Sequence, residues 1–271
     1  MKLDDADPSD IAVYVTSFDG YSDLWGPFFQ CFWRHWSDCP FQVFLGGTSK
    51  GFDDERVKFL HSTEGKGWSD RAIEHLGNIR ENYVLMFLED WFLKEFVDTA
   101  RLVSMIEQFK QFDGEMLRLV PDPKPTVAIG GCPEFGYLGL GLMNRSNTHA
   151  TIWKRETLMA LIKEGESLWE FEVFGAIRSN QFSGGFFSVW ERQVDYCGAV
   201  DAGKYTREAI RMMHRRGIAY DANARAQKTL VETIKWKSSS ALRSILRLFT
   251  SLRMRQNLQR IILGHTAKVR K

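Results

Sequence analysis

The sequence of 271 residues is 44% hydrophobic and 13% aromatic, which suffices for one well-packed domain with extensions or for two small domains. No apolar run reaches the roughly 18 residues of a transmembrane helix, and the acidic start MKLDDADPSD lacks the pattern of a secretory signal. The four cysteines show no CxxC spacing, so we expect a cytoplasmic protein with reduced thiols rather than disulfides or a zinc site.

The net charge of +2 conceals two regions of opposite sign. Residues 226–271 contain 11 Lys and Arg and a single acid, Glu232, whereas residues 1–225 hold more acids than bases. An acidic body with a basic tail predicts that the two regions contact different partners. Because the body is acidic and no nucleic-acid-binding module is recognisable, no nucleic-acid partner is expected.

Up to residue 111, short apolar runs alternate with segments whose apolar residues recur every three to four positions. This alternation predicts parallel βαβ units of an α/β fold, in which ligands bind beyond the carboxyl ends of the strands. Pro27 is expected in the first turn of the first helix, Ser69 as the N-cap of the second and Asp98 as the N-cap of the third. The expected strands are 11–18, 41–47, 57–62 and 83–88, and the expected helices are 24–36, 68–80 and 97–111.

After residue 120 the pattern becomes mixed. Residues 127–147 are glycine-rich and partly alternating, which is typical of a hairpin with a long loop. Further along, the sequence predicts a short strand near residue 151, a helix over 155–163, a helix that begins near Trp169, one or two strands within 187–200, and a helix over 206–218 that Gly217 ends.

The stretch YVLMFLEDWFL places two carboxylates directly after a buried strand. A strand covered on both faces is apolar until it emerges at the sheet edge, so Glu89 and Asp90 are candidates for a functional site. On one extended strand the two side chains would point to opposite faces. The plain alternative is a strand end with solvated acids.

The stretch ESLWEFE places three acids around two aromatic residues. A carboxylate in an aromatic environment has its pKa raised by desolvation, which suits a general base. Glu170 and Glu172 are therefore candidate catalytic residues. Acids at the start of a helix also favour the helix dipole without any catalytic role, and that alternative stays open.

Two further stretches lie where parallel strands and helices meet the expected binding edge. Thr16, Ser17, Asp19 and Tyr21 follow the first strand, where an acid accepts hydrogen bonds from a ribose or base and a ring stacks on a base. Arg71 lies in the first turn of the second predicted helix, where it suits a phosphate or a base. Ordinary turn residues and a surface arginine are the alternatives.

Several common catalytic motifs are missing from the sequence. There is no GxSxG, Walker loop, helix-opening GxGxxG or HExxH, which disfavours the corresponding hydrolases, NTPases and dehydrogenases. CFWRHWSDC offers Cys31, His35 and Cys39 to a metal, but packed thiols are the favoured interpretation. Among the histidines, His149 precedes a predicted strand near the expected binding edge.

Taken together, these stretches resemble bacterial GT-A-type glycosyltransferase-like proteins of polysaccharide and lipopolysaccharide biosynthesis. The resemblance covers residues 11–218 and rests on SFDGYSDLWGPFFQCFWRHWSDCPFQVFL, WSDRAIEHLGNIRENYVLMFLEDWFL and ATIWKRETLMALIKEGESLWEFE. It implies a GT-A-like α/β fold with a Rossmann-type mixed sheet flanked by helices. The domain would span residues 1–225, with a nucleotide-sugar half at about 10–125 and an acceptor half at about 126–225.

The resemblance also implies roles for the candidate residues. LEDWF takes the place of the DxD motif of the family, although it contains no Asp-x-Asp, so Asp90 becomes the contact for Mn²⁺ or Mg²⁺ and Glu89 its neighbour. Glu172, ahead of Glu170, takes the place of the base that deprotonates the acceptor hydroxyl. The loop containing Thr16, Ser17, Asp19 and Tyr21 would hold the base and ribose, and Arg71 the base or diphosphate.

The implied activity is transfer of a sugar from a nucleotide-sugar donor to a hydroxyl of a glycan or lipid-linked acceptor, with inversion, in surface polysaccharide synthesis. The missing Asp-x-Asp keeps an alternative open, namely a catalytically inactive GT-A-like module that binds a nucleotide sugar or organises an assembly complex. A nucleotidyltransferase is disfavoured because SFDGYSD has no basic residue for a phosphate loop.

The tail at 226–271 has its own pattern. ALRSILRLFTSLRMRQNLQRIILG alternates apolar and arginine residues as a basic amphipathic helix does. Such a helix binds an anionic membrane surface, which would place the protein at the inner face of the cell membrane beside a lipid-linked acceptor. Packing of the helix on its own domain or on a partner is an equal alternative.

Overall fold

The computed structural model describes residues 10–234. The amphipathic helix expected over residues 241–264 of the basic tail lies outside the described residues. Within residues 10–234, no helix combines the length and the apolar character that crossing a membrane requires.

The core of the structure is a mixed nine-stranded sheet in the order β3-β2-β1-β4-β9-β6-β10-β8-β7. The first four strands are parallel, as the sequence predicted, while β9 runs antiparallel between β4 and β6. The strands are β1 (Ile11–Thr16), β2 (Gln42–Gly46), β3 (Val57–Leu60), β4 (Tyr83–Leu88), β6 (Met116–Arg118), β7 (Val127–Ile129), β8 (Cys132–Tyr137), β9 (Thr151–Lys154) and β10 (Phe186–Val189).

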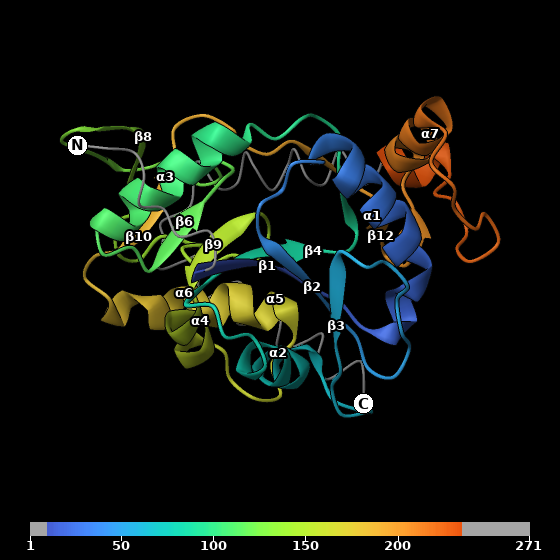
Figure 1. The fold of residues 1–271 in the computed structure, drawn as a ribbon, viewed down its shortest axis with the longest axis horizontal. Coiled ribbons are helices and arrows are strands. Elements are labelled where there is room, and N and C mark those ends of the chain that lie inside the picture. Colours follow the sequence, from blue (N-terminus) through green and yellow to red (C-terminus); the bar gives the residue numbers. More distant parts are fainter. Residues whose placement is uncertain (1–9, 235–271) are drawn as a thin grey trace.

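Helices cover both faces of the sheet (Figure 1). Side chains of α1, α3 and α7 pack on one face, and those of α2 and α4 pack on the other. The strands are therefore apolar at successive positions rather than at alternate ones, which is the pattern of a sheet buried on both faces. The helices are α1 (Ser22–His35), α2 (Trp68–Gly77), α3 (Thr99–Gln111), α4 (Arg155–Leu161), α5 (Leu168–Glu170), α6 (Ala176–Arg178) and α7 (Arg207–Arg216).

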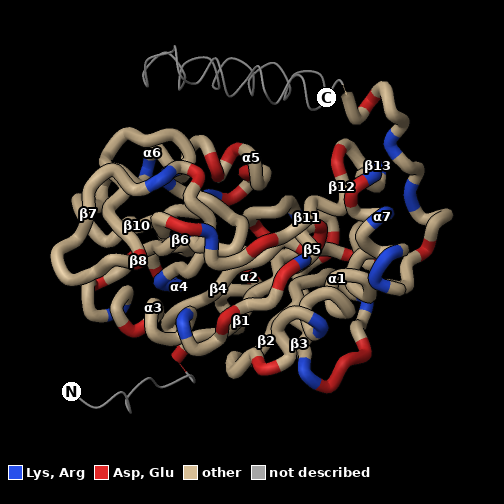
Figure 2. The backbone as a smooth tube through the Cα atoms, turned by 90° about the horizontal axis from the view of Figure 1, so that it is seen from above, with Lys and Arg blue, Asp and Glu red and all other residues tan. Residues whose placement is uncertain are grey.

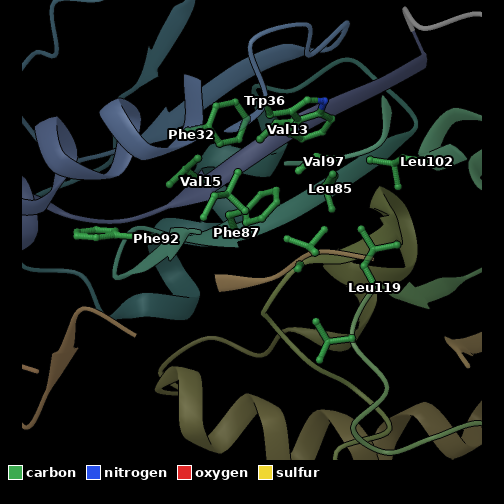
Figure 3. Close-up of a cluster of buried hydrophobic side chains, with 14 of the residues drawn as sticks. Val13, Val15, Phe32, Trp36, Leu85, Phe87, Phe92, Val97, Leu102 and Leu119 are labelled. Atoms are coloured by element: carbon green, nitrogen blue, oxygen red, sulfur yellow. The ribbon is translucent and has the colours of Figure 1, made fainter. Parts of the chain in front are cut away.

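Large aromatic side chains fill the core beneath α1. Phe32 contacts the rings of Trp36 and Phe87, at centroid distances of 5.4 and 6.0 Å, and all three are buried (Figure 3). This packing fixes α1 against the middle of the sheet. It thereby also fixes the loop between β1 and α1, at the carboxyl end of β1.

A second, two-stranded sheet joins distant parts of the chain. β5 (Trp91–Leu93) follows β4 almost immediately and pairs antiparallel with β11 (Tyr196–Gly198). The pairing sets Trp91 opposite Gly198. It carries the segment after β10 back to the carboxyl end of β4, so residues from both halves of the chain meet there. Another short pair, β12 (Val200–Asp201) and β13 (Lys204–Tyr205), follows.

Local signals in the sequence have mixed outcomes. The carboxylate of Asp98 accepts a hydrogen bond from the N–H of Arg101 at 3.0 Å, which confirms it as the N-cap of α3. Gly217 ends α7 with φ of 61°, also as predicted. Ser69 is not an N-cap because α2 begins one residue earlier, after Gly67. Pro27 lies in the second turn of α1, since the helix begins at Ser22.

We predict that Phe32→Ala lowers the free energy of unfolding by about 3–5 kcal/mol, because it removes a fully buried ring and leaves a cavity. Urea unfolding followed by circular dichroism measures this change. The matched control is Phe96→Ala, which removes a ring with 78% of its surface exposed and should cost less than about 1 kcal/mol. Equal losses in both variants would contradict the assignment of this core.

Candidate functional site

The carboxyl ends of β1, β2 and β4 lie side by side, because these strands are parallel neighbours. Residues that follow these strands therefore gather at one edge of the sheet, where open α/β sheets bind ligands. In Figure 2, acidic and basic segments meet around β5 and β11, next to this edge. The loop after β1, the turn after β4 and the segment after β11 all lie at this edge.

Glu89 and Asp90 lie in a turn between β4 and β5, not on an extended strand. The expectation that they alternate across two strand faces is therefore wrong, because the strand ends at Leu88 and a turn follows. Glu89 is 7% exposed. Burial, and next the charge of Asp90, raise the pKa of Glu89 well above its ordinary value. Burial also raises the pKa of Asp90 to about 6.

The turn is held in place by its neighbours. The N–H of Ala199 donates to the carbonyl oxygen of Asp90 at 2.6 Å, so the segment after β11 fixes the backbone of the turn. The hydroxyl of Ser17 interacts with the carboxyl of Glu89. Trp25 in turn donates from Nε1 to the hydroxyl of Ser17 at 2.7 Å. The two acids thus lie on a rigid support.

Arg225 is the basic residue that faces the two acids. Its guanidinium binds Asp23 through two hydrogen bonds of 2.7 Å and lies over the ring of Tyr21 at 4.3 Å. Its positive charge lowers the pKa of both Glu89 and Asp90, against the larger effect of burial. Arg225 therefore closes one side of the site, although it is distant in sequence from the other residues.

Asp19 connects the loops after β1 and β2. Its carboxylate accepts hydrogen bonds from the backbone N–H groups of Thr48, Ser49 and Lys50 and from the hydroxyl of Ser49, at 2.8 to 3.0 Å. Partial burial opposes ionisation, but these hydrogen bonds outweigh it and lower the pKa of Asp19 to about 2. Its carboxylate is thus already engaged in shaping the loop.

Thr16 and Arg71 support the same edge from the side of α2. The hydroxyl of Thr16 lies 3.2 Å from both Tyr14 Oη and Trp68 Nε1. The guanidinium of Arg71 lies over the ring of Phe18 at 4.7 Å and donates to the carbonyl oxygen of Lys66. Its Nε is buried and has no hydrogen-bond partner among the described residues, and burial lowers the pKa of Arg71.

The three acids of ESLWEFE have different surroundings. Glu166 forms two hydrogen bonds, of 2.7 and 2.6 Å, with Arg178. Glu170 completes a capping box with Ser167 at the start of α5. Both carboxylates are thus engaged in local structure, and Glu172 remains as the candidate base among the three acids.

Glu172 lies in a π-helical turn, η3 (Phe171–Gly175), that follows α5 directly. Such turns occur often at functional sites. The Oε1 atom of Glu172 accepts a hydrogen bond from Thr148 Oγ1 at 2.8 Å and lies 3.3 Å from Asn147 Nδ2. It also lies 3.5 Å from His149 Nδ1. The carboxylate is oriented, and its side chain is 13% exposed.

His149 and Trp91 connect Glu172 to the acids at the end of β4. The His149 ring lies edge-on to Trp91 at 4.6 Å and stacks on Tyr196 at 6.5 Å. Trp91 directly follows Asp90. Burial lowers the pKa of His149, which favours its neutral form, against the charge of Glu172. The candidate base and the candidate diphosphate contact are thus separated by two packed rings.

A divalent ion at this edge would need further oxygen ligands from a bound phosphate, in addition to protein carboxylates. Among residues 10–234, no group of three or more His, Cys, Asp and Glu side chains could hold a metal by itself. The charge of Asp90 nevertheless opposes the ionisation of Glu89, so a cation beside the pair would relieve this repulsion. Mg²⁺ commonly binds one or two carboxylates together with substrate phosphates. The pair therefore fits a metal that a phosphate ligand completes.

The comparisons with solved structures return matches of low similarity to the mixed sheet with helices on both faces. S. aureus TarS 1-349 in complex with UDP-GlcNAc matches with 12% identity and a TM-score of 0.47 over 72% of this chain. The chain spans 60% of the length of that structure. Bifunctional IspDF from Campylobacter jejuni matches with 14% identity and a TM-score of 0.39, over 70% of this chain and 52% of its own.

A mycobacterial protein matches with 12% identity and a TM-score of 0.42, over 79% of this chain and 76% of its own. No protein-family model and no curated protein matches the sequence. At these identities and TM-scores the matches are too distant to assign a substrate or a reaction.

The structure brings together most of the residues singled out in the sequence. Thr16, Ser17, Tyr21, Glu89 and Asp90 share the edge with Arg71, whereas Glu170 belongs to a helix cap. Sequence reasoning missed Tyr196 and Arg225, which lie beside these residues, because neither belongs to a local motif.

We predict that Asp19→Asn destabilises the protein by about 1–2 kcal/mol at neutral pH, because an amide cannot accept all four hydrogen bonds. The loss stays this small because water screens the charge of the partly exposed carboxylate. Because folding lowers the pKa of Asp19, its ionised carboxylate stabilises the folded protein, and this stabilisation is complete above the pKa that Asp19 has in the unfolded chain. That contribution is lost as the pH falls toward 2. The difference in unfolding free energy between the variant and the wild type should therefore shrink on acidification.

Urea unfolding at several pH values measures the difference. The exposed Asp38 supplies a matched control, since Asp38→Asn should leave stability unchanged within about 0.5 kcal/mol. A destabilisation by Asp19→Asn that grows on acidification would contradict the role assigned to Asp19.

Proposed function

We propose that the protein is a glycosyltransferase that moves a sugar from a nucleotide-sugar donor to a hydroxyl of a glycan or lipid-linked acceptor, with inversion. One observation carries the proposal. A series of contacts from Trp91, the neighbour of Asp90, through His149 connects two buried acids at the carboxyl ends of the parallel strands with an oriented carboxylate, Glu172. A donor group and a general base are both needed for transfer, and this arrangement supplies places for both.

The donor would lie across the carboxyl ends of β1, β2 and β4. Tyr21 would stack on the base, and Thr16 and Ser17 would line the loop that holds the base and ribose. Asp19 serves by keeping this loop in shape, since its carboxylate is already hydrogen-bonded. In this assignment residues 10–125 form the donor half and residues 126–225 the acceptor half of one domain.

The diphosphate would lie near Asp90, with Glu89 behind it. Arg71 offers an unused buried Nε from one side, and Arg225 brings positive charge from the other. A Mn²⁺ or Mg²⁺ ion held by Asp90, with Glu89, would stabilise negative charge on the leaving phosphate when bound. The two guanidiniums supply positive charge at the same edge.

Glu172 would act as the general base. It takes the proton of the acceptor hydroxyl as the oxygen forms its bond to the anomeric carbon and the bond from that carbon to the phosphate oxygen breaks. The nucleoside diphosphate leaves, and displacement in line inverts the anomeric carbon. Thr148 and Asn147 hold the carboxylate in place, and neutral His149 lies beside it.

The sequence resemblance suggests that the reaction belongs to surface polysaccharide synthesis, and the acceptor is proposed on that basis. The basic tail at 226–271 would attach the protein to the anionic inner face of the cell membrane, where a lipid-linked acceptor is present. In this proposal the catalytic body itself is cytoplasmic. Attachment to anionic vesicles that disappears when the tail is removed would support this part.

We predict that Glu172→Gln lowers the turnover of the productive nucleotide sugar by about 10²–10⁴-fold, because the amide cannot accept the proton. Binding of the nucleotide should persist, since Glu172 lies in the acceptor half. A panel of nucleotide sugars, assayed for release of the nucleoside diphosphate with acceptor mixtures, identifies the donor and measures the effect.

The matched control is Glu170→Gln, two residues away, which weakens a helix cap and should change turnover by less than threefold, the effect of about 0.5 kcal/mol. Near-full activity of Glu172→Gln would overturn the general base and favour a retaining reaction. Nucleotide binding without any turnover across the panel would favour the alternative of a catalytically inactive GT-A-like binding module.

A further inference from the structure

Arg118 is a buried arginine at the end of β6. It lies in the middle of the sheet, opposite Thr151 of β9 and Ser188 of β10, and 5% of it is exposed. An arginine so deep in a sheet needs partners for its charge and its N–H groups, because an unpaired buried charge is strongly unfavourable.

The partners that Arg118 has are too few. Within residues 10–234, the one hydrogen bond of its side chain runs from Nη1 to the carbonyl oxygen of Asn144 at 2.6 Å. Its Nε is buried and has no hydrogen-bond partner among the described residues, and none of their carboxylates lies within 4.0 Å of its guanidinium. Burial lowers the pKa of Arg118, against the charges of Asp122 and Glu172.

Arg145 shows how a structural arginine is accommodated in this protein. It is 1% exposed, and its guanidinium donates to the carbonyl oxygens of Leu138, Ser179 and Phe182 and to the hydroxyl of Ser179. It also lies over the ring of Phe186 at 4.0 Å. Arg145 therefore has no need of a ligand, in contrast to Arg118.

The surroundings of Arg118 place it in the acceptor half of the site. Its positive charge lowers the pKa of both His149 and Tyr196, the two rings that pack with Trp91, in each case after the effect of burial. The charge of Glu172 also acts on it. Arg118 thus lies near the candidate base but on a different strand from the two acids that follow β4.

We propose that Arg118 binds an anionic group, a carboxylate or a phosphate, of the acceptor molecule. This inference rests on the proposed function, since it assigns the acceptor to this part of the site. The planar guanidinium offers a fork of N–H donors that matches either anion. Repulsion by Glu172 would keep the anion on the Arg118 side and leave the neutral hydroxyl that reacts beside Glu172.

The test uses glucuronate and glycerol 3-phosphate as probes, with glucose and glycerol as their neutral counterparts. Each is titrated into the full-length protein and followed by NMR, without nucleotide. We expect one anionic probe to bind while its neutral counterpart does not, and the probe that binds distinguishes a carboxylate from a phosphate. Arg118→Gln should weaken that binding at least about tenfold.

The matched control is Arg192→Gln, which removes a more exposed guanidinium 5.8 Å from the ring of Tyr196 and should change binding by less than threefold. Anion binding that survives Arg118→Gln, or binding of neither anion, would overturn the inference. The proposed function is tested separately by nucleotide binding, so loss of either result leaves the other interpretable.

Thermal stability gives a second readout. Because the charge of Arg118 is unpaired, Arg118→Gln should leave the melting temperature unchanged or raise it by a few degrees. Arg145→Gln removes a fully bonded guanidinium and should lower it. A fall for Arg118→Gln as large as that for Arg145→Gln would make Arg118 a structural residue and overturn the inference.

Discussion

The burial of two adjacent carboxylates at the end of β4 is the constraint on which the site depends. Charges in a region of low dielectric need a compensating cation, and Arg225 supplies part of that compensation from far along the chain. Glu89 and Asp90 keep raised pKa values nevertheless, so the compensation is incomplete. A cation bound beside the two carboxylates would complete the compensation.

The short pairing of β5 with β11 makes the two halves of the chain into one site. It follows the acidic turn without a break and sets Trp91 beside the segment that contains Tyr196. His149 packs against both rings and lies near Glu172. Residues from the first and second halves of the chain thereby touch through these side chains.

Sequence patterns predicted the parallel strands β1 to β4, the helices that cover them and the edge at which Glu89 and Asp90 gather, because burial on both faces leaves apolar runs. They could not predict the turn at Glu89, which depends on the hydrogen bond from Ala199. Only the family resemblance put Glu172 ahead of Glu170, and the capping box of Glu170 gives a structural reason that residue patterns do not contain. Arg118 and Arg225 carry no local signal, and tertiary contacts alone place them.

The most direct measurement is calorimetric titration of the full-length protein with UDP, GDP, CDP and dTDP, each with and without Mn²⁺. The account predicts that one of them binds with one-to-one stoichiometry and that Asp90→Ala removes any enhancement by Mn²⁺. It also predicts that Arg71→Ala weakens binding under both conditions. Failure of all four nucleotides to bind, with or without the metal, would contradict the assignment of the β1–β4 edge as a nucleotide-sugar site.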